Sequence, residues 1–503
     1  MKQYIENILN ARVYDVATES SLHTAKGLSR RMDNRVLLKR EDEQSVFSFK
    51  CRGAYNRIFA LQKQQKIAGV VTASAGNHAQ GVALAAKQLG LTSIIVMPVT
   101  TPPIKVSAVN ALEGTSVLHG DNYDEACAHA LRIAEEKGYP FIHAFDSADT
   151  IAGQGTIGME ICRQHPDPIH AVFVPVGGGG LIAGVAVYIK YLRPDIKIIG
   201  VEPDDANAMH ESLKQGHRVT LDRVGMFADG VAVRQVGEET FRLCQKYVDD
   251  VILVSVDEIS AAVKDIFDDT RTVMEPSGAL AVAGMKKYVA QTGVSGESLV
   301  AITSGANVNF DRLRHIAERA EVGEQREALL AVTVPERPGS FRKFCRTIGK
   351  RSVTEFNYRY ADKDSARVFA GIELRGGDQE REQMIDMLGD AGYPVIDLTA
   401  DEMAKLHIRY MVGGHAKDVD NELLYRFEFP ERPGALLEFL DRMARGWNIS
   451  LFHYRNHGSA FGRALVGIQV PPDERGQFQE FLDALGYNYY PETDNPAYQA
   501  FLA

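Results

Sequence analysis

A lysine in an apolar, close-packed setting is the first residue of this chain that could perform covalent chemistry. Lys50 lies in the segment 48–54, SFKCRGA, between Phe49 and a Gly-Ala pair that lets backbones approach closely. An isolated lysine is most often a solvated surface charge. If this one is desolvated, its pKa falls and the free amine can attack an aldehyde. The motif alone leaves both interpretations open.

Residues 72–78, TASAGNH, offer a site for an anion at the start of a helical run. Their small side chains leave backbone N–H groups and hydroxyls uncovered, where the helix dipole favours a negative charge such as a substrate carboxylate. Ser74 or Asn77 could instead cap the helix. The candidate carboxylate site comprises Ser74, Ala75, Gly76, Asn77 and His78.

Four consecutive glycines in the segment 176–181, VGGGGL, offer a site for a phosphate. A tight turn needs one or two glycines, whereas four can form a nest of amides around a phosphate. Gly178, Gly180 and Ala183 also match the spacing of a dinucleotide-binding loop. Glu202 follows at the place where such a fold keeps its ribose-binding acid. A nicotinamide-dependent dehydrogenase is therefore an alternative at this point.

The segment 303–307, TSGAN, adds the hydroxyl of Ser304 at the end of a β-rich run. Together the four motifs supply an amine, a carboxylate site, a phosphate site and a hydroxyl. A dehydrogenase accounts for the phosphate site alone. Pyridoxal phosphate accounts for all four, because it brings an aldehyde, a phosphate and a ring nitrogen to an amino-acid substrate.

The elements that must position these motifs are β-rich runs alternating with helical runs. The β-rich runs occupy 35–40, 69–74, 93–98, 171–176, 197–202 and 299–304. This alternation predicts an α/β fold with parallel sheets covered by helices on both faces. Ligands bind outside the carboxyl ends of the strands in such sheets, and the last three motifs each follow a β-rich run.

Beyond residue 320 the chain contains two copies of one unit. PERPG at 335–339 recurs at 430–434, and TEFNYRY at 354–360 corresponds to SLFHYRN at 450–456. Each copy predicts a βαββαβ module of the ferredoxin-like kind, and both copies resemble the ACT family of amino-acid-sensing domains.

Composition excludes several other classes of protein. The 503 residues are 45% hydrophobic and 24% charged, with a net charge of -10, so the chain should fold and has no non-specific attraction to nucleic acid. No apolar run approaches the length of a membrane helix, and no signal peptide is recognisable. Five scattered cysteines favour neither a disulfide framework nor a zinc site. We therefore expect a cytoplasmic protein with no nucleic-acid or membrane partner.

The four motifs resemble, in their order, those of the threonine ammonia-lyase family. SFKCRGA, TASAGNHAQG, PVGGGGL and TSGANVN carry this resemblance, and residues 1 to about 320 resemble the fold-type II pyridoxal phosphate enzymes. The duplicated tail resembles the regulatory region of the long biosynthetic members. The resemblance implies a catalytic domain at 1–320, ACT-like α+β domains at 325–400 and 425–503, and a connector at 401–424.

The resemblance also implies roles for individual residues. Lys50 would hold pyridoxal phosphate covalently and remove the substrate's Cα proton, Asn77 would lie beside the 3-hydroxyl, and Ser304 would face the pyridine nitrogen. The cofactor-binding residues would be Lys50, Phe49, Asn77, Gly177, Gly178, Gly179, Gly180, Leu181 and Ser304. The segment 74–78 would hold the substrate carboxylate.

The activity implied is the conversion of L-threonine to 2-oxobutanoate and ammonia, the first step of isoleucine biosynthesis. The resemblance further implies that the enzyme is a homotetramer. Isoleucine would inhibit it, and valine would counteract that inhibition. L-Serine is a possible second substrate, since it lacks only one methyl group. Serine dehydration, a β-replacement reaction, a dehydrogenase and a non-catalytic amino-acid sensor are the alternatives.

Two further expectations concern the effectors and metals. Effector-binding residues are expected on the second strand of each repeat, although cross-strand packing is an alternative. They are Phe356, Tyr358, Arg359, Phe452, Tyr454 and Arg455. We expect no metal site, because Ala208 stands where related enzymes with a divalent cation carry an acid six residues after the glutamate, here Glu202.

Substitution of Ser304 by Asp tests its implied role. A carboxylate would hold the ring nitrogen protonated and make the cofactor a stronger electron sink, which stabilises longer-lived carbanions. We expect Ser304→Asp to lower β-elimination and raise side transamination. The two products are quantified by chromatography, and a product ratio equal to that of the unmodified enzyme would contradict the role.

Overall fold

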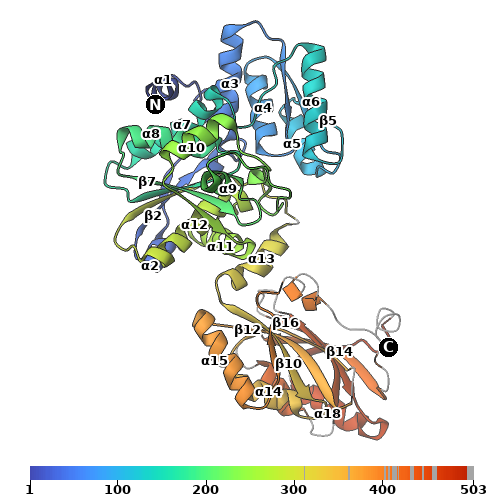
Figure 1. Cartoon of the computed structure of the whole chain (residues 1–503). Coiled ribbons are helices and arrows are strands. Elements are labelled where there is room, and N and C mark those ends of the chain that lie inside the picture. Colours follow the sequence, from blue (N-terminus) through green and yellow to red (C-terminus); the bar gives the residue numbers. More distant parts are fainter. Residues whose placement is uncertain are drawn as a thin grey trace. The chain divides into compact units, whose positions relative to one another are not determined.

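The computed structural model divides the chain into two compact units, Met1–Gly323 and Glu324–Ala503 (Figure 1). The residues it describes are 1–310, 312–360, 363–401, 404–405, 408–410, 416, 419–430, 435–443, 447–455, 461–485 and 487–495. Of these, residues 428–430, 435, 455 and 461–463 are described by their backbone alone.

The first unit alternates strands and helices over most of its length. Up to residue 137 its elements are α1 (Lys2–Leu9), β1 (Leu22–Thr24), α2 (Lys26–Met32), β2 (Arg35–Arg40), η1 (Glu41–Glu43), α3 (Lys50–Gln64), β3 (Gly69–Ala73), α4 (Asn77–Gln88), β4 (Thr92–Met97), α5 (Pro103–Ala111), β5 (Thr115–Leu118) and α6 (Tyr123–Lys137). They continue with α7 (Ala148–Gln164), β6 (Ala171–Pro175), α8 (Gly180–Leu192), β7 (Lys197–Pro203), α9 (Ala208–Gln215), η2 (Asp229–Val231), α10 (Glu238–Tyr247), β8 (Asp250–Val254), α11 (Val256–Thr270), α12 (Pro276–Thr292), β9 (Ser298–Thr303) and α13 (Arg312–Gly323).

These strands form two sheets. The larger has the order β1-β2-β9-β6-β7-β8, in which β1 is antiparallel to β2 and all other neighbours are parallel. The smaller sheet, β3-β4-β5, is parallel throughout. Both match the predicted α/β class, and the six predicted β-rich runs coincide with β2, β3, β4, β6, β7 and β9 to within one residue at each end.

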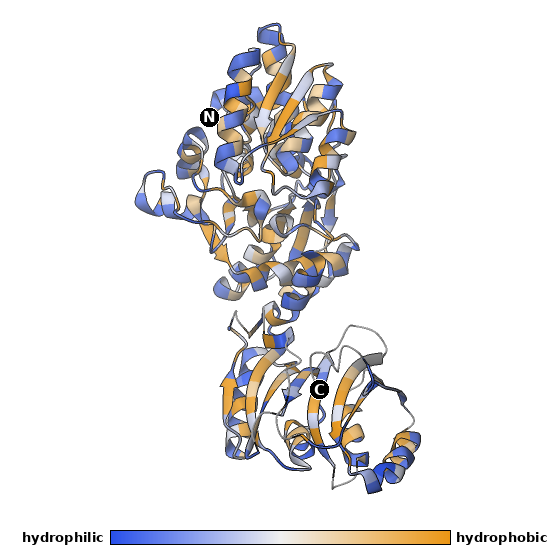
Figure 2. Ribbon diagram, turned by 90° about the vertical axis from the view of Figure 1, so that its right-hand side faces the viewer, coloured by the Kyte–Doolittle hydropathy of each residue, from blue (hydrophilic) through white to orange (hydrophobic). Residues whose placement is uncertain are grey.

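Helices cover both faces of the six-stranded sheet because its strands are apolar on both sides. In β6, Val172 and Val174 pack against residues of α7 and α8, whereas Ala171 and Phe173 pack against residues of α11 and α12. The strands are accordingly hydrophobic along their length, while the helices carry hydrophilic outer faces (Figure 2). The sheet is buried on both sides, as parallel sheets require.

The second unit contains the two predicted repeats. The first comprises β10 (Glu327–Pro335), α14 (Ser340–Ile348), β11 (Val353–Arg359), β12 (Ser365–Glu373), α15 (Gly377–Asp390) and β13 (Val395–Asp397). The second comprises β14 (Glu422–Pro430), α17 (Ala435–Arg442), β15 (Asn448–Arg455), β16 (Phe461–Gln469), η4 (Pro472–Glu474), α18 (Arg475–Leu485) and β17 (Asn488–Pro491), and η3 (Ile408–Tyr410) lies between the repeats. Each repeat therefore has the predicted βαββαβ order.

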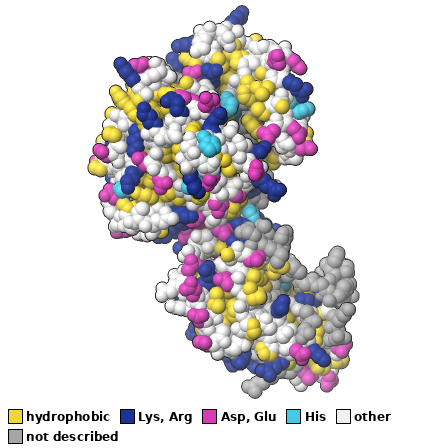
Figure 3. Space-filling view, viewed as in Figure 1, with side chains coloured by type: hydrophobic (Ala, Val, Ile, Leu, Met, Phe, Trp, Pro, Cys, Tyr) yellow, Lys and Arg dark blue, Asp and Glu magenta, His cyan; other side chains and the backbone are white. Residues whose placement is uncertain are grey.

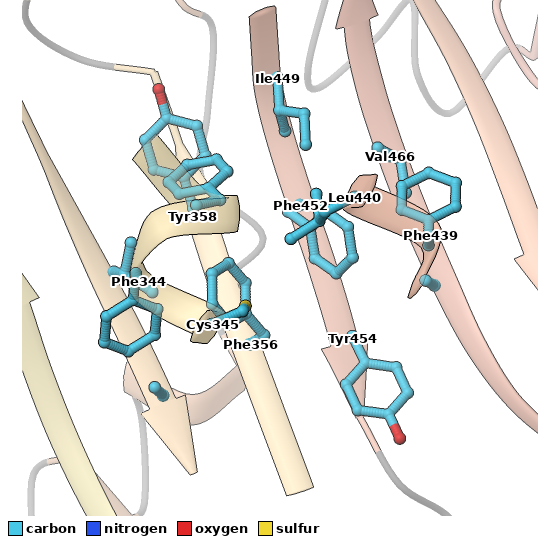
Figure 4. Close-up of a cluster of buried hydrophobic side chains, with 14 of the residues drawn as sticks. Phe344, Cys345, Phe356, Tyr358, Phe439, Leu440, Ile449, Phe452, Tyr454 and Val466 are labelled. Atoms are coloured by element: carbon cyan, nitrogen blue, oxygen red, sulfur yellow. The ribbon is translucent and has the colours of Figure 1, made fainter. Parts of the chain in front are cut away.

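One antiparallel sheet joins the repeats, in the order β13-β10-β12-β11-β15-β16-β14-β17. Its centre is the pairing of β11 with β15, in which Phe356 lies opposite Tyr454 and Tyr358 opposite Phe452. Side chains of α14, α15, α17 and α18 share one core with this sheet. The cluster includes Phe344, Phe439 and Val466 (Figure 4). The two copies therefore fold around a common core.

The repeated turn PERPG owes its glycine to backbone geometry in the first copy. Gly339 precedes α14 with a φ of 88°, a left-handed conformation that side chains with a Cβ seldom adopt. The corresponding turn of the second copy, residues 431–434, lies outside the described residues.

The chain shows no helix, among the residues described, that has both the length and the apolar composition to span a bilayer. On the visible face of the molecule, basic and acidic side chains are interspersed (Figure 3).

Candidate functional site

A backbone pairing between two distant segments positions Lys50. Ser48 forms an isolated antiparallel bridge with Gly305, Phe49 N donates to Ser304 O at 3.3 Å, and Ala306 N donates to Phe47 O at 2.9 Å. The first predicted motif is thereby tied to the last, beside the carboxyl end of β9. Helix α3 begins at Lys50, so the lysine and Ser304 both lie beside the carboxyl end of β9.

The amine of Lys50 forms no ion pair or hydrogen bond among the described residues. Its Nζ lies 5.2 Å from the centre of the Phe49 ring. Burial lowers the pKa of Lys50 to about 8, and the negative charge of Glu275 opposes that shift. The amine therefore has a larger neutral fraction near pH 7 than an exposed lysine has, which is the form that attacks a carbonyl.

Asn77, the first residue of α4, is held from two sides. Its Nδ2 donates to Oε1 of Glu275 at 2.6 Å, and its Oδ1 accepts from Nδ2 of Asn307 at 2.7 Å. Asn307 in turn donates to the carbonyl of Val46 at 2.8 Å. The amide plane of Asn77 is therefore fixed, and one N–H remains for a ligand.

The loop before α4 is open on one side and anchored on the other. Ser74 Oγ accepts from Gly76 N at 3.2 Å, and a Cβ placed on Gly76 would meet no atom within 4 Å. Ala75 packs on the small-sheet side. The ring of His78 is turned inward, where Nε2 donates to the carbonyl of Ile142 at 3.1 Å, and burial lowers its pKa to about 3. The ring is thus neutral, and the loop backbone is the part suited to an anion.

The glycine loop after β6 leaves backbone amides unpaired at the start of α8, as far as the described residues go. Gly178 O accepts from Thr240 Oγ1 at 2.6 Å, and Gly179 adopts a φ of 93°. Within the described residues, the N–H groups of Gly177, Gly178 and Gly179 donate to no acceptor. Leu181 is buried in the core behind the loop. The loop can therefore bind a phosphate through backbone N–H groups at a helix N-terminus.

Ser304 lies at the same edge of the sheet as the glycine loop. β6 and β9 are parallel neighbours, so the residues that follow them emerge side by side. Ser304 is 4% exposed, and its Oγ donates to the carbonyl of Ser277 at 3.3 Å. The hydroxyl of Ser277 is buried and has no hydrogen-bond partner in the described part of the chain. The structure thus supplies hydroxyl groups, a free amine and free amides, and this set fits pyridoxal phosphate.

Glu202 caps the helix that follows it. Its two carboxylate oxygens accept from the N–H groups of Met209 at 2.9 Å and His210 at 2.8 Å, in the first turn of α9. Burial raises the pKa of Glu202 to about 8. In the described part of the chain, no group of three or more His, Cys, Asp or Glu residues is placed to hold a metal ion.

A buried charge network, which the sequence motifs did not indicate, lies behind the lysine motif. Arg52 Nε contacts Glu41 at 2.8 Å, Arg52 Nη1 contacts Glu160 at 2.6 Å, and Lys39 Nζ contacts Glu160 at 2.6 Å, all with side chains fully buried. Two positive and two negative groups balance, so each charge is compensated. The network ties α3, which begins at Lys50, to β2, η1 and α7.

The predicted effector residues lie on the paired strands β11 and β15. The rings of Phe356 and Phe452 are buried and 5.3 Å apart. Tyr454 is buried opposite Phe356, and Arg359 forms an ion pair with Glu422 at 2.5 Å. The side chain of Arg455 lies outside the described residues. Phe356, Phe452 and Tyr454 therefore take part in cross-strand packing, and their role in effector binding stays a prediction.

Tyr358 differs, because it leads to a pocket between the repeats. Its hydroxyl donates to Glu336, which also accepts from Asn448 Nδ2 at 2.9 Å. The pocket is lined by Pro335, Glu336, Arg337, Gly339, Ser340, Phe341, Arg342, Leu440, Met443, Trp447, Asn448 and Ile449. The sequence analysis missed this pocket, although the repeated PERPG motif, which contains Glu336 and Arg337, was the feature that could have indicated it.

Comparisons with known families agree with both halves of this description. A family model described as pyridoxal-phosphate dependent enzyme matches residues 13–305. A model described as the C-terminal regulatory domain of threonine dehydratase matches residues 318–408 and again 413–502.

Individual relatives are similar over the full length. The chain is 56% identical over 506 residues to a biosynthetic L-threonine dehydratase of Burkholderia multivorans, covering 99% of each chain. It is 54% identical over 501 residues to that of Escherichia coli, covering 100% of this chain and 97% of the relative.

Solved structures resemble the first unit. The processed form of threonine deaminase isoform 2 from Solanum lycopersicum is 54% identical with a TM-score of 0.62, covering 63% of this chain and 93% of that one. Maize serine racemase is 34% identical with a TM-score of 0.59, covering 62% of this chain and 95% of its own.

Removal of Arg52 tests the charge network. In Arg52→Met, Glu41 and Glu160 lose their shared partner while still buried, so we expect the free energy of unfolding to fall by about 3–5 kcal/mol. The matched control is Arg57→Met, which removes the part-exposed pair with Asp149 and should cost below about 1 kcal/mol. Urea denaturation measures the free energy of unfolding of both variants. Equal losses would show that the buried network stabilises the fold no more than a part-exposed ion pair does.

Proposed function

The chain belongs to the family of biosynthetic threonine dehydratases, and we propose that it converts L-threonine to 2-oxobutanoate and ammonia with pyridoxal phosphate on Lys50. The observation that carries the proposal is the unpartnered, desolvated amine of Lys50 beside Ser304, Asn77 and the free amides of the glycine loop. The dehydrogenase alternative uses only the loop, and Glu202, which it requires, already caps α9.

Each group of residues has a separate task in this reaction. Pyridoxal phosphate, when bound, supplies an electron-withdrawing ring that acidifies the Cα–H of an attached amino acid. Lys50, with its lowered pKa, takes that proton. The 74–76 backbone at the start of α4 holds the substrate carboxylate, and the 177–181 loop holds the phosphate. The β-hydroxyl leaves as water with a proton returned by Lys50, and the released enamine hydrolyses to 2-oxobutanoate and ammonia.

Ser304 favours elimination among the reactions open to this fold. A neutral hydroxyl at the ring nitrogen makes the ring a weaker electron sink than a carboxylate would, so the β-hydroxyl is expelled before competing reactions occur. Serine dehydration stays a second activity, because the two substrates differ by a single methyl worth about 1–3 kcal/mol in an apolar pocket.

We also propose that the second unit senses amino acids. The pocket at Glu336 combines a carboxylate and guanidinium groups with apolar walls, as an α-amino acid with a branched side chain requires. Isoleucine as inhibitor and valine as antagonist fit this chemistry. On this proposal, the catalytic domain ends near residue 323 and the two modules follow it, in a cytoplasmic homotetramer.

The activity is tested directly with purified protein. Addition of L-threonine should release 2-oxobutanoate and ammonia in equal amounts, and Lys50→Ala should reduce the rate by more than about a thousandfold. Lys63→Ala, an exposed lysine on the same helix, serves as the control and should leave the rate unchanged. Hydride transfer with a nicotinamide cofactor and a hydroxy acid, in place of deamination, would refute the proposal.

Removal of the second unit separates catalysis from regulation. A chain ending at Gly323 should still deaminate threonine, because the residues of the site all lie in the first unit. We expect it to lose inhibition by isoleucine, since coupling requires the second binding site. The test measures initial rates over a range of isoleucine concentrations. Inhibition retained by the shortened chain would show that the effector site does not lie in the second unit.

A further inference from the structure

Glu275 is a buried carboxylate that the proposed reaction does not yet use. It directly precedes Pro276, the first residue of α12, and is 5% exposed. A residue in this position commonly caps its own helix, but the Glu275 side chain makes no such bond. Its Oε1 instead accepts the N–H of Asn77 at 2.6 Å. The carboxylate therefore faces the cofactor site.

Charged groups from four other elements act on Glu275 or respond to it. Asp229 of η2 faces it, and Asp229 is itself paired with Lys105 of α5 at 2.7 Å and with Arg312 of α13 at 3.1 Å. Those two cations are therefore engaged by Asp229. Lys50, at the start of α3, is also under the negative charge of Glu275. The geometry brings the two together, because Oε1 of Glu275 lies 2.7 Å from the position that a Cβ on Gly305 would take, and Gly305 pairs with Ser48, two residues before Lys50.

The ionisation of Glu275 decides which way the Asn77 amide points. An ionised carboxylate can only accept, so it requires the Nδ2 of Asn77, and the Oδ1 then accepts from Asn307. A protonated carboxyl can donate, which would allow the amide to turn over. Burial, followed by the charge of Asp229, raises the pKa of Glu275 to about 7, so both forms occur near neutral pH.

We propose that Glu275 is a positioning residue of the catalytic site, which fixes the Asn77 amide toward the cofactor and holds a proton on the Lys50 nitrogen by its negative charge. This inference rests on the proposed function. It assigns to Glu275 two separable effects: the orientation of Asn77 depends on the reach of the carboxylate, and the protonation at Lys50 depends on its charge.

Two substitutions separate these effects. Glu275→Gln keeps the length of the side chain and removes the charge, whereas Glu275→Asp keeps the charge and withdraws it from Asn77. The control is Glu202→Gln, which neutralises another buried glutamate, one that caps α9 away from Lys50. All are measured as full-length protein loaded with pyridoxal phosphate.

The main readout is the visible absorption of the bound cofactor as a function of pH, without substrate. Loss of the negative charge disfavours the protonated nitrogen, so the titration midpoint should fall by at least about half a unit in Glu275→Gln. It should stay at the wild-type value in Glu202→Gln and near it in Glu275→Asp. In Glu275→Asp, kcat for threonine should fall about tenfold or more, because Asn77 loses its clamp.

The outcomes distinguish this inference from the proposed function. An unshifted midpoint in Glu275→Gln, or wild-type kcat in Glu275→Asp, overturns the role of Glu275 while the enzyme remains a threonine ammonia-lyase. If Glu275→Gln does not fold, the test rests on Glu275→Asp alone. A wild-type kcat in that variant contradicts the role of the Glu275–Asn77 hydrogen bond. A reduced kcat with an unshifted titration midpoint supports it. If the wild-type protein binds no pyridoxal phosphate, the proposed function itself is contradicted.

Discussion

The pairing of residues 47–49 with residues 304–306 is the constraint on which the catalytic site depends. It closes the chain over some 250 residues and brings the start of α3 to the carboxyl end of β9. The Lys50 amine at this junction is desolvated, and it forms no ion pair or hydrogen bond within the described residues. The same segments place Ser304 and Asn307, so a single local pairing sets the amine, a hydroxyl and the support of Asn77.

The structure treats its buried charges in two different ways. Around Arg52 and Lys39, each buried charge meets an opposite one within hydrogen-bonding distance, which stabilises the junction of α3 with the large sheet. Glu275 in the catalytic site forms no ion pair among the described residues, because Lys105 and Arg312 pair with Asp229 and Lys50 responds to its charge at longer range. A buried carboxylate without an ion-pair partner destabilises the folded protein, and such groups are concentrated in catalytic sites.

Sequence patterns predicted the features that depend on neighbouring residues, such as strands and helices, and missed the contacts between residues far apart in the chain. The strands, the helix that starts near Asn77 and the repeats were recognisable because apolar runs and glycine turns act locally. The partners of Arg52 and the acid at Glu275 were not, since each meets its partners across the fold. The same holds for the repeats, where Arg359 turned out to be paired with Glu422 and the pocket formed at Glu336.

The most direct test of the account is the covalent state of Lys50 in the protein as purified with pyridoxal phosphate. Reduction with borohydride, followed by proteolysis and mass spectrometry, identifies the lysine that carries the cofactor. The account predicts a pyridoxyl group on the peptide that contains Lys50 and on no other. A label on a different lysine, or an unmodified Lys50 peptide from protein that deaminates threonine, would contradict it.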